Sequence, residues 1–363
     1  MTGTLLDAVD MAVLETDGHE IQAFGPAGER KLRDETRDLL LVTTEIARGW
    51  PRDRPEPEIF AEAARAVADE HIHAAESFLA EHGLAWSDFD LLGVHGQTVL
   101  HERPTPDRIG RTVQLLDAEH LAKASGRSVA FDFRTPPTWR RAGRGAAGPD
   151  LSRPPAPGPR AWAAPVAALN IGGVANITLI NDHDDLLAFD TGPGNGMIDL
   201  DAAGARPGPV RRERPPGRVG PGGPRRSCNQ FLSSSYFSGP APKSLDRYDF
   251  PLDLVEPLSA EDAAATLVAF TAEAVIKAFD HGARPSALIV CGGGRHNPQI
   301  MRSLIERAPV PVKTAEDYGW RGDSIEAEAF AYLAARTAAG LPISFPGTTG
   351  VKAPMTGGRI VTP

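Results

Sequence analysis

The stretch from 186 to 199 restricts the possible fold more than any other part of the chain. An apolar run from Leu186 ends in a carboxylate, Asp190, and a turn rich in glycine and proline follows at once. A short apolar run bounded by a turn is typical of a buried strand. We therefore expect Asp190 at a strand end, beside a turn whose backbone N–H groups can cradle a phosphate. A tight turn with a capping Asp is an equally good interpretation of these residues alone.

Other segments repeat this alternation of strand, glycine turn and helix. Residues 166–180 predict a β-hairpin, and 287–291 predict a buried strand that runs into three glycines, 292–294. Apolar residues at helical spacing predict helices over 58–82, 262–279, 297–307 and 324–339. Strands that alternate with helices indicate an α/β fold. The glycine loop fits neither the GxGxxG nor the P-loop pattern, which disfavours those two nucleotide-binding folds.

Length and composition are those of a globular protein. The chain has 363 residues, which predicts two domains. Its net charge of -9 argues against non-specific binding to nucleic acid. The two cysteines, Cys228 and Cys291, predict neither a disulfide framework nor a metal site. We recognise no signal peptide and no apolar run approaching ~18 residues, so the expected location is the cytoplasm, away from membranes.

Polar side chains follow two further apolar runs. His95, Gln97 and Thr98 lie in a predicted turn after one run, where loops place ligand contacts. Asp132 and Arg134 end another predicted strand, and their spacing would put both side chains on one face. They could bind a substrate carboxylate or hydroxyl groups. A turn with satisfied polar groups and a plain salt bridge are the alternatives.

The beginning of the chain and the last predicted helix add candidates of a second kind. Thr2, Gly3 and Thr4, with Asp7, form a turn before a strand, as in a phosphate-binding hairpin, although a disordered terminus would give the same pattern. Glu326 lies near the start of the last helix, where the helix dipole favours an acid whatever its function.

In their order along the chain, these segments resemble the anhydro-N-acetylmuramic acid kinase family of actin-like, sugar-kinase ATPases. The motifs that carry the resemblance are Met1-Thr2-Gly3-Thr4 with Leu6-Asp7, His95-Gly96-Gln97-Thr98, Asp132-Phe133-Arg134, Asn170-Ile171-Gly172-Gly173-Val174-Ala175-Asn176-Ile177-Thr178, Phe189-Asp190-Thr191-Gly192-Pro193-Gly194-Asn195, Pro242-Lys243-Ser244, Cys291-Gly292-Gly293-Gly294 with Asn297-Pro298, and Glu326-Ala327-Glu328-Ala329-Phe330-Ala331. They span nearly the whole chain.

The resemblance implies a two-domain, actin-like α/β fold with a central nucleotide cleft. We expect an N-terminal α/β domain over 1–131 and a ribonuclease-H-like domain over 132–363, with the last helix packing back on the first domain.

The resemblance also implies an activity. Such enzymes use ATP, Mg²⁺ and water to open the 1,6-anhydro ring of anhydro-N-acetylmuramic acid and to phosphorylate O6, in cell-wall recycling. Asp190 would be the base that activates water, and Asp7 would contact Mg²⁺. The expected nucleotide contacts are Thr2, Gly3, Thr4, Asp7, Gly192, Gly194, Asn195, Gly292, Gly293 and Gly294. The expected sugar contacts are His95, Gln97, Thr98, Asp132, Arg134 and Glu326.

The expected partner is therefore a small amino sugar, and the resemblance also implies a homodimer. A kinase of the same fold with another sugar substrate is one alternative. An inactive nucleotide-binding protein is the other.

Two stretches, 135–163 and 203–227, depart from the family pattern. From Arg206 to Arg226 all but three residues are Arg, Pro or Gly. With suitable codons, a one-base shift turns 210–220 into Tyr-Asp-Ala-Asn-Gly-Arg-Leu-Gly-Ala-Ser-Gly, which resembles the family sequence. We interpret both stretches as frame-shifted and expect them to be disordered. A genuine Pro/Arg-rich loop is the alternative.

Overall fold

A computed structural model describes residue 2 and residues 6–102, 110–134, 165–181, 185–202, 223–245 and 249–363. The chain forms two compact units, which are described separately. Unit 1 combines Met1–Pro157 with Ser324–Pro363, and unit 2 is the continuous segment Gly158–Asp323. The expected boundary was 131/132. The last long helix, α9 (Ile325–Ala338), belongs to unit 1 and packs on its first strand, β1.

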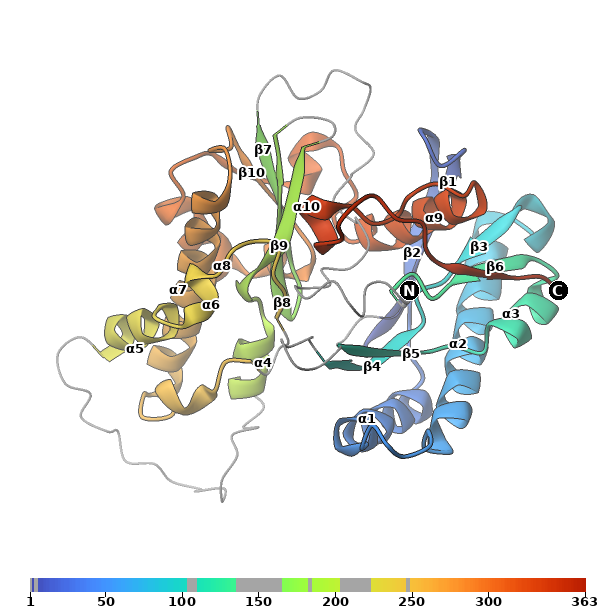
Figure 1. Cartoon of the computed structure of the whole chain (residues 1–363), viewed down its shortest axis with the longest axis horizontal. Helices are drawn as coiled ribbons and strands as arrows, with labels where there is room; N and C mark the ends of the chain where they lie inside the picture. The colour runs from blue at the N-terminus through green and yellow to red at the C-terminus, as the bar shows by residue number, and fades with distance from the viewer. Residues whose placement is uncertain are drawn as a thin grey trace. The chain divides into compact units, whose positions relative to one another are not determined.

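The described residues of unit 2 form a five-stranded sheet in the order β11-β10-β7-β8-β9. Figure 1 labels its strands β7, β8, β9 and β10. The strands are β7 (Val166–Ile171), β8 (Val174–Ile180), β9 (Leu186–Pro193), β10 (Leu288–Cys291) and β11 (Val312–Thr314). β7, β8 and β9 run antiparallel to one another, β10 runs parallel to β7, and β11 runs parallel to β10. Three antiparallel strands extended by two parallel ones are the pattern of a ribonuclease-H-like sheet, which the family resemblance implies.

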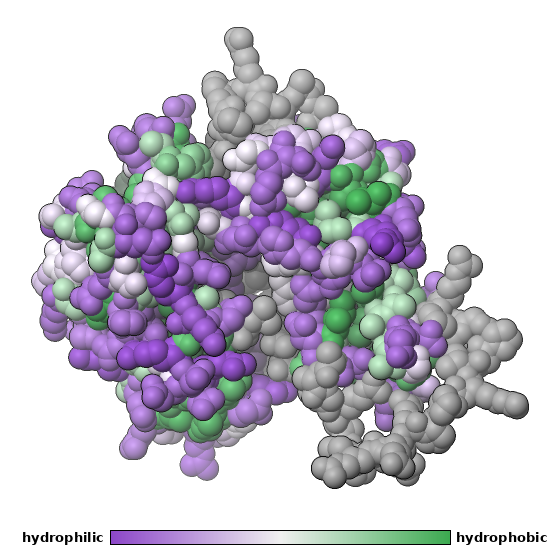
Figure 2. All heavy atoms as spheres, turned by 180° about the vertical axis from the view of Figure 1, so that it is seen from behind, coloured by the Kyte–Doolittle hydropathy of each residue, from purple (hydrophilic) through white to green (hydrophobic). Residues whose placement is uncertain are grey.

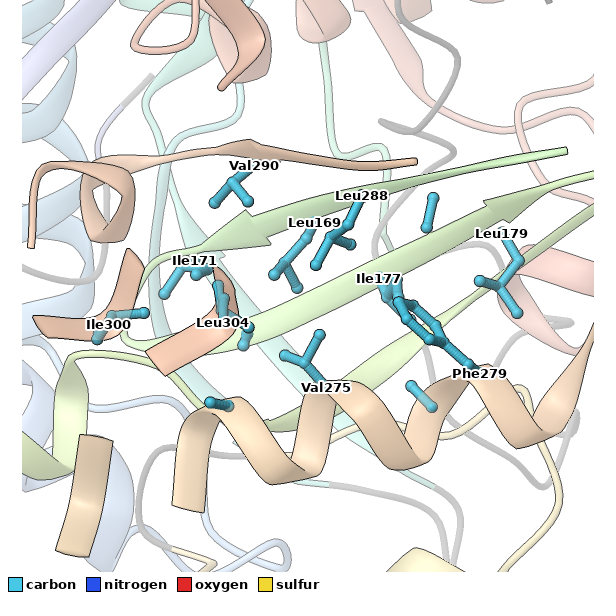
Figure 3. Close-up of a cluster of buried hydrophobic side chains, with 14 of the residues drawn as sticks. Leu169, Ile171, Ile177, Leu179, Val275, Phe279, Leu288, Val290, Ile300 and Leu304 are labelled. Atoms are coloured by element: carbon cyan, nitrogen blue, oxygen red, sulfur yellow. The ribbon is translucent and has the colours of Figure 1, made fainter. Parts of the chain in front are cut away.

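Helices cover one face of this sheet and close the core of unit 2. The helices are α4 (Gly196–Ala202), α5 (Gly223–Leu232), α6 (Ser235–Ser238), α7 (Ala260–Ala278) and α8 (Pro298–Arg307). Figure 3 shows Val275 and Phe279 pointing toward the strand residues Leu169 and Ile177. All four are buried, and burial of such side chains contributes about 1.5–3 kcal/mol each.

The described residues of unit 1 form three small sheets, a hairpin β1-β2, a hairpin β4-β5 and the sheet β12-β6-β3. Its elements are β1 (Ala8–Thr16), β2 (Ile21–Lys31), α1 (Asp34–Gly49), α2 (Ile59–His82), β3 (Leu91–Gly93), β4 (Gln97–Glu102), β5 (Arg111–Leu115), α3 (Ala118–Ser125), β6 (Ser128–Phe131), α9, α10 (Pro346–Thr349) and β12 (Arg359–Val361). Helix α2 packs against α1, α3 and the two hairpins, and α9 packs against β1, β3 and β6.

Local sequence explains where several of these elements end. Helix α2 ends at Gly83, whose φ of 65° is left-handed and costs a glycine little. Asp117 caps α3 by accepting a hydrogen bond from the backbone N–H of His120. Asn297 caps α8 in the same way, and Pro298 follows at the first helical position.

The surface is mainly hydrophilic, with separate hydrophobic patches (Figure 2). Three of the exposed large apolar side chains described, Leu41, Val42 and Ile46, lie on α1. Across the described ranges, no helix combines the length and apolar character that crossing a bilayer requires.

Three expectations about local structure are wrong. Asp190 lies inside β9, which continues to Pro193. Gln97 and Thr98 belong to a strand of their own, β4, rather than to a turn. The strand before Arg134 ends at Phe131, so strand alternation does not set the directions of Asp132 and Arg134.

The frame-shift interpretation falls mostly on residues outside the described ranges. Residues 135–163 and 203–222 belong to that part. The end of the second stretch, 223–227, was expected to be disordered but lies in helix α5, and Cys228 of the same helix is buried.

Candidate active site

Asp190 lies in unit 2 at an irregularity of the sheet. Asn176 of β8 pairs with Asp190, whereas the preceding Ala175 pairs with Gly192, so Thr191 is an extra residue on β9. A bulge of this kind bends a strand and re-aims its side chains, and it is common next to active sites. The Thr191 hydroxyl donates to the carbonyl of Ala175 at 3.2 Å. The bulge therefore decides where the Asp190 carboxylate points.

Both oxygens of the Asp190 carboxylate accept hydrogen bonds. Asn176 Nδ2 donates to Oδ1 at 2.9 Å, and the backbone N–H of Leu245 donates to Oδ2 at 2.6 Å. Asp190 is only 9% exposed. Donors on both oxygens stabilise the carboxylate as an anion and hold it in one orientation. A carboxylate held in this way is a base of the kind that accepts a proton from water.

The segment before Leu245 completes this support. The Asp190 N–H donates to the carbonyl of Lys243 at 3.0 Å, and the Tyr236 hydroxyl donates to the carbonyl of Asp190 at 2.5 Å. The Lys243 ammonium in turn donates to the carbonyls of Tyr236 and Gly239 at 2.9 and 3.1 Å. Burial lowers the pKa of Lys243. Lys243 thus holds the segment from Tyr236 to Gly239 in place beside β9.

The glycine turn after Asp190 does not form the expected phosphate nest. The N–H groups of Gly194 and Gly196 donate to the carbonyl of Gly173, and the N–H of Asn195 donates to that of Gly172. A Cβ on Gly194 would lie 2.2 Å from the carbonyl oxygen of Gly172. These glycines are therefore required by close packing of two turns, and their amides are already bonded.

Gly192 has a similar explanation. A Cβ there would lie 2.8 Å from the Cβ of Ala274 on α7. The glycine allows β9 and α7 to approach, so contact between two elements accounts for it without a ligand.

The three glycines after β10 differ from one another. Gly292 has a φ of +74°, and a Cβ there would lie 2.1 Å from Asn170 Oδ1. A Cβ on Gly294 would lie 2.2 Å from Ile171 Cγ2. A Cβ on Gly293 would meet nothing within 4 Å, and this residue is exposed. Close contacts within the protein therefore require glycine at 292 and 294. Gly293 has no such contact, and a nucleotide could approach its exposed backbone.

The three glycines do not stand at the N-terminus of helix α8. Gly293 and Gly294 lie in a short 3-10 turn, Gly293–His296, and Asn297 follows this turn and caps the first N–H groups of α8. Any contact with a nucleotide would be made by the turn, and the helix dipole would act from further away.

The side chain of Arg295 stabilises this turn through hydrogen bonds. Its guanidinium donates to Asp323 through two nitrogens at 2.7 and 2.6 Å, to Glu316, and to the carbonyl of Gly292 at 3.0 Å. The Arg295 side chain is only 4% exposed. Hydrogen bonds from Arg295 lower the pKa of Asp323. The bidentate ion pair therefore fixes the backbone from which Gly292 and Gly293 project.

In unit 1, several expected sugar contacts lie together around β4 and β5. His95, Gln97 and Thr98 are adjacent in the chain, and Gln114 of β5 donates to His95 Nε2 at 2.6 Å and to Thr98 Oγ1 at 3.3 Å. Burial lowers the pKa of His95 well below its usual range, and the positive charge of Arg134 lowers it further. His95 is therefore neutral near pH 7, and Arg134 lies near this group.

The expected phosphate hairpin is only partly described. Gly3 and Thr4 lie outside the described residues. Thr2 forms a bridge with Val9, and its hydroxyl donates to the carbonyl of Gly96 at 3.1 Å. Thr2 is buried, and its hydrogen bond to Gly96 connects the start of the chain to the loop that carries His95.

Three acidic side chains share one region of unit 1. Burial raises the pKa of Asp10 to about 6, and repulsion from Glu326 and Asp7 adds to the effect. Asp7 is exposed and accepts from the N–H of Ala8 at 3.0 Å. Among the described residues, no three His, Cys, Asp or Glu side chains converge as a ready metal cage. Mg²⁺ is commonly held by one or two carboxylates, phosphate and water, and Asp7 suits that arrangement.

Asp132 adopts an uncommon backbone conformation, with a φ of 55°. Non-glycine residues in this region are held there by their surroundings and occur often at functional sites. The turn at Asp132 leads directly to Phe133, which is buried against Phe330 of α9 with ring centroids 5.6 Å apart. This packing fixes the position of the backbone from which the Arg134 side chain extends.

A family model of anhydro-N-acetylmuramic acid kinase matches residues 1–363. The chain belongs to this kinase family. A relative named anhydro-N-acetylmuramic acid kinase from Caulobacter vibrioides is 71% identical over 364 residues, covering 99% of this chain and 97% of the relative. One of the same name from Phenylobacterium zucineum is 59% identical over 377 residues, covering 100% and 98%. As a family member the protein is a kinase, that is, a phosphotransferase.

A solved structure of an inorganic polyphosphate/ATP-glucomannokinase from Arthrobacter aligns over 92% of this chain and 94% of its own, with 12% identity and a TM-score of 0.36, so the similarity is distant. The expected two-domain α/β kinase fold agrees with family membership and with the strand order of unit 2.

Four residues around these sites were not among the candidates from the sequence. Asn176 and Lys243 appear in family-like motifs but received no role there, and Asp10 and Gln114 were not singled out. Asn176 could have been found from the hairpin register, because it faces Asp190 once β8 and β9 are paired. Gln114 gives no local signal, since a single Gln in a strand is usually a surface residue.

Proposed function

We propose that this kinase uses ATP and water to open the 1,6-anhydro ring of anhydro-N-acetylmuramic acid and to phosphorylate O6. The products would be N-acetylmuramate 6-phosphate and ADP, as needed in cell-wall recycling. The observation that carries the proposal is the buried Asp190 carboxylate, held by Asn176 and Leu245, in a chain of this kinase family.

Asp190 is the proposed general base. Water attacks the anomeric carbon as the bond from that carbon to O6 breaks, and Asp190 accepts the proton that the water loses. O6 keeps the electron pair of the broken bond and takes the γ-phosphoryl group of ATP, and ADP leaves. Base catalysis of this kind contributes about 10²–10⁴-fold. Ordinary sugar kinases act on a free hydroxyl group, so a base that serves water distinguishes this reaction from theirs.

The nucleotide would be bound at Gly292 and the turn Gly293–His296 that follows it, where Gly293 has exposed backbone. When bound, ATP with Mg²⁺ supplies the phosphoryl group and neutralises its charge. Asp7 would hold Mg²⁺, and Thr2, Gly3 and Thr4 remain proposed phosphate contacts. Gly192, Gly194 and Asn195 are assigned only a supporting role, because protein contacts account for them.

The sugar would be bound in unit 1 by the side chains around His95. Arg134 is a suitable partner for the lactyl carboxylate, because a guanidinium binds a carboxylate through two parallel hydrogen bonds. Gln97, Thr98, Asp132 and Glu326 remain proposed sugar contacts. A cytoplasmic, homodimeric protein agrees with the proposal, and light scattering of the purified protein would test the dimer.

One assay tests the reaction. The purified protein is incubated with ATP, Mg²⁺ and anhydro-N-acetylmuramic acid in water enriched in ¹⁸O. The proposal expects ADP and a sugar phosphate with solvent ¹⁸O at C1. A phosphorylated sugar without the label would indicate an ordinary sugar kinase, and nucleotide binding without ADP would indicate an inactive protein.

A further inference from the structure

Both ring nitrogens of His95 are already bonded to the protein. Nδ1 lies 2.8 Å from the carbonyl oxygen of Gly96, and Nε2 lies 2.6 Å from the side-chain nitrogen of Gln114. A carbonyl oxygen only accepts, so Nδ1 carries the proton. The neutral ring then has its lone pair on Nε2 and requires a donor there. His95 has no ring nitrogen left for a sugar hydroxyl.

This protonation fixes the orientation of the Gln114 amide. Its nitrogen must face His95, and in this orientation it also donates to Thr98 Oγ1 at 3.3 Å. The His95 ring is itself held against Phe330 of α9, with ring centroids 4.7 Å apart. The imidazole is therefore a fixed acceptor that decides which way the amide of Gln114 turns.

The orientation leaves an acceptor without a partner. Among the described residues, Gln114 Oε1 is buried and accepts no hydrogen bond, and Oε1 of Gln97, on the paired strand β4, is in the same state. Leaving such an oxygen unbonded costs about 1–3 kcal/mol. Gln114, Thr98 and Arg134 are each half-buried, so the group reaches the edge of the described part of unit 1. A ligand that donates a hydrogen bond would remove this cost.

We propose that Gln114 is a specificity-determining residue for the sugar, with its Oε1 accepting a hydrogen bond from an uncharged donor of the substrate. The donor is a hydroxyl group or the acetamido N–H. His95 is a positioning residue that acts through Gln114. The inference rests on the proposed function, because it takes the amino sugar to be the ligand.

Binding of three sugars by calorimetry tests this assignment. The sugars are anhydro-N-acetylmuramic acid, its 4-deoxy analogue and an analogue that lacks the 2-acetamido group. We expect the wild-type protein to bind one analogue about 5- to 150-fold more weakly than the parent sugar, which corresponds to one lost hydrogen bond. The analogue that loses affinity identifies the donor.

The variant Gln114→Met keeps the length of the side chain and removes the acceptor. We expect it to bind the parent sugar and the affected analogue equally. The matched control, Gln22→Met, changes an exposed Gln of β2 and should keep the wild-type ratio. A general structural defect would weaken all sugars together and would leave the ratio unchanged.

A second variant, Gln114→Glu, keeps an acceptor but loses the donor to His95. We expect it to retain the preference for the donor-bearing sugar, which also covers the case in which Gln114→Met fails to fold. The inference is overturned if Gln114→Met keeps the wild-type ratio, if Gln114→Glu loses it, or if the wild-type protein binds both analogues as well as the parent. Absence of any binding to the parent sugar by the wild-type protein would instead overturn the proposed function.

Discussion

Asn176 and Asp190 face each other across β8 and β9, and Asn176 Nδ2 donates to Asp190 Oδ1 at 2.9 Å. The pair lies next to the bulge at Thr191, so the amide holds the carboxylate where the strand is irregular. The two residues come from one antiparallel pair of strands, and their separation is set by strand pairing.

Replacing the base itself is the most direct test of this site. Asp190→Asn keeps the size of the side chain but cannot accept a proton from water. We expect turnover to fall about 10²–10⁴-fold or below detection, while the dissociation constant for ATP stays near the wild-type value. Steady-state kinetics and calorimetry measure the two quantities. Turnover at the wild-type rate would show that another group activates water.

Changing Asn176 should affect the rate through the position of the carboxylate. Asn176→Ala removes the donor to Oδ1, and we expect kcat to fall about 10²-fold, because a small misplacement of a reacting group can have an effect of this size. Asn176→Asp places a second carboxylate beside the first. Repulsion should then raise the pKa of the pair and move the acidic limb of the pH–rate profile to higher pH. An unchanged profile would contradict the assignment.

Arg295 offers a test of the nucleotide turn. Arg295→Met removes the donors to Asp323 and to the carbonyl of Gly292 and leaves two carboxylates without their common partner. We expect the KM for ATP to rise by about tenfold or more, with a smaller change in the KM for the sugar, because losing one charged hydrogen bond costs about 1.5–3 kcal/mol. Arg307→Met is a suitable control, since Arg307 pairs with Glu273 at the surface. Equal effects of the two variants would show that Arg295 acts only on general stability.

Asp10 makes stability depend on pH. Its pKa in the folded protein is about 6, above the ordinary value of 3.8. The folded state therefore binds the Asp10 proton more tightly than the unfolded state does. The stabilisation that proton binding gives to the fold is fully present below about pH 4, and it is lost as pH rises through 6. The upper bound is about 3 kcal/mol, reduced by solvent screening because the group is partly exposed. Asp10→Asn should raise the melting temperature more at pH 7 than at pH 5, and an equal change at both would contradict this.

The frame-shift interpretation predicts a result in the gene. Sequencing the region that encodes 135–163 and 203–227 should show that one-base shifts restore the family motifs in both stretches. The mass of the protein purified from its natural host should then differ from that of the printed sequence. If no such shift restores the motifs, the two stretches are genuine insertions.

The sequence predicts much of the fold because many signals are local. The end of α2 at Gly83 and the β7–β8 hairpin follow from glycine turns and apolar spacing over a few residues. Helix α1 was missed because many of its side chains are polar, and its buried residues, Leu40, Thr43 and Ala47 among them, form only a narrow face.

The site is less predictable because it depends on pairing between distant residues. Asp190 was recognised by its motif, but its place within β9 depends on the register with β8. The bonded state of His95 depends on Gln114, which lies 19 residues away along the chain. Neither relationship leaves a pattern in a local window of sequence.

The division of the chain has a consequence for the order of events during synthesis on a ribosome. Unit 2 is continuous, whereas unit 1 needs α9 and the pairing of β12 with β6, which come after unit 2 in the chain. The segment before residue 158 therefore lacks α9 and β12 while unit 2 is synthesised, and unit 2 can fold first. A nascent chain that stalls after residue 323 would expose the faces of β1, β3 and β6 that α9 covers, so chaperone binding should concentrate on that interval.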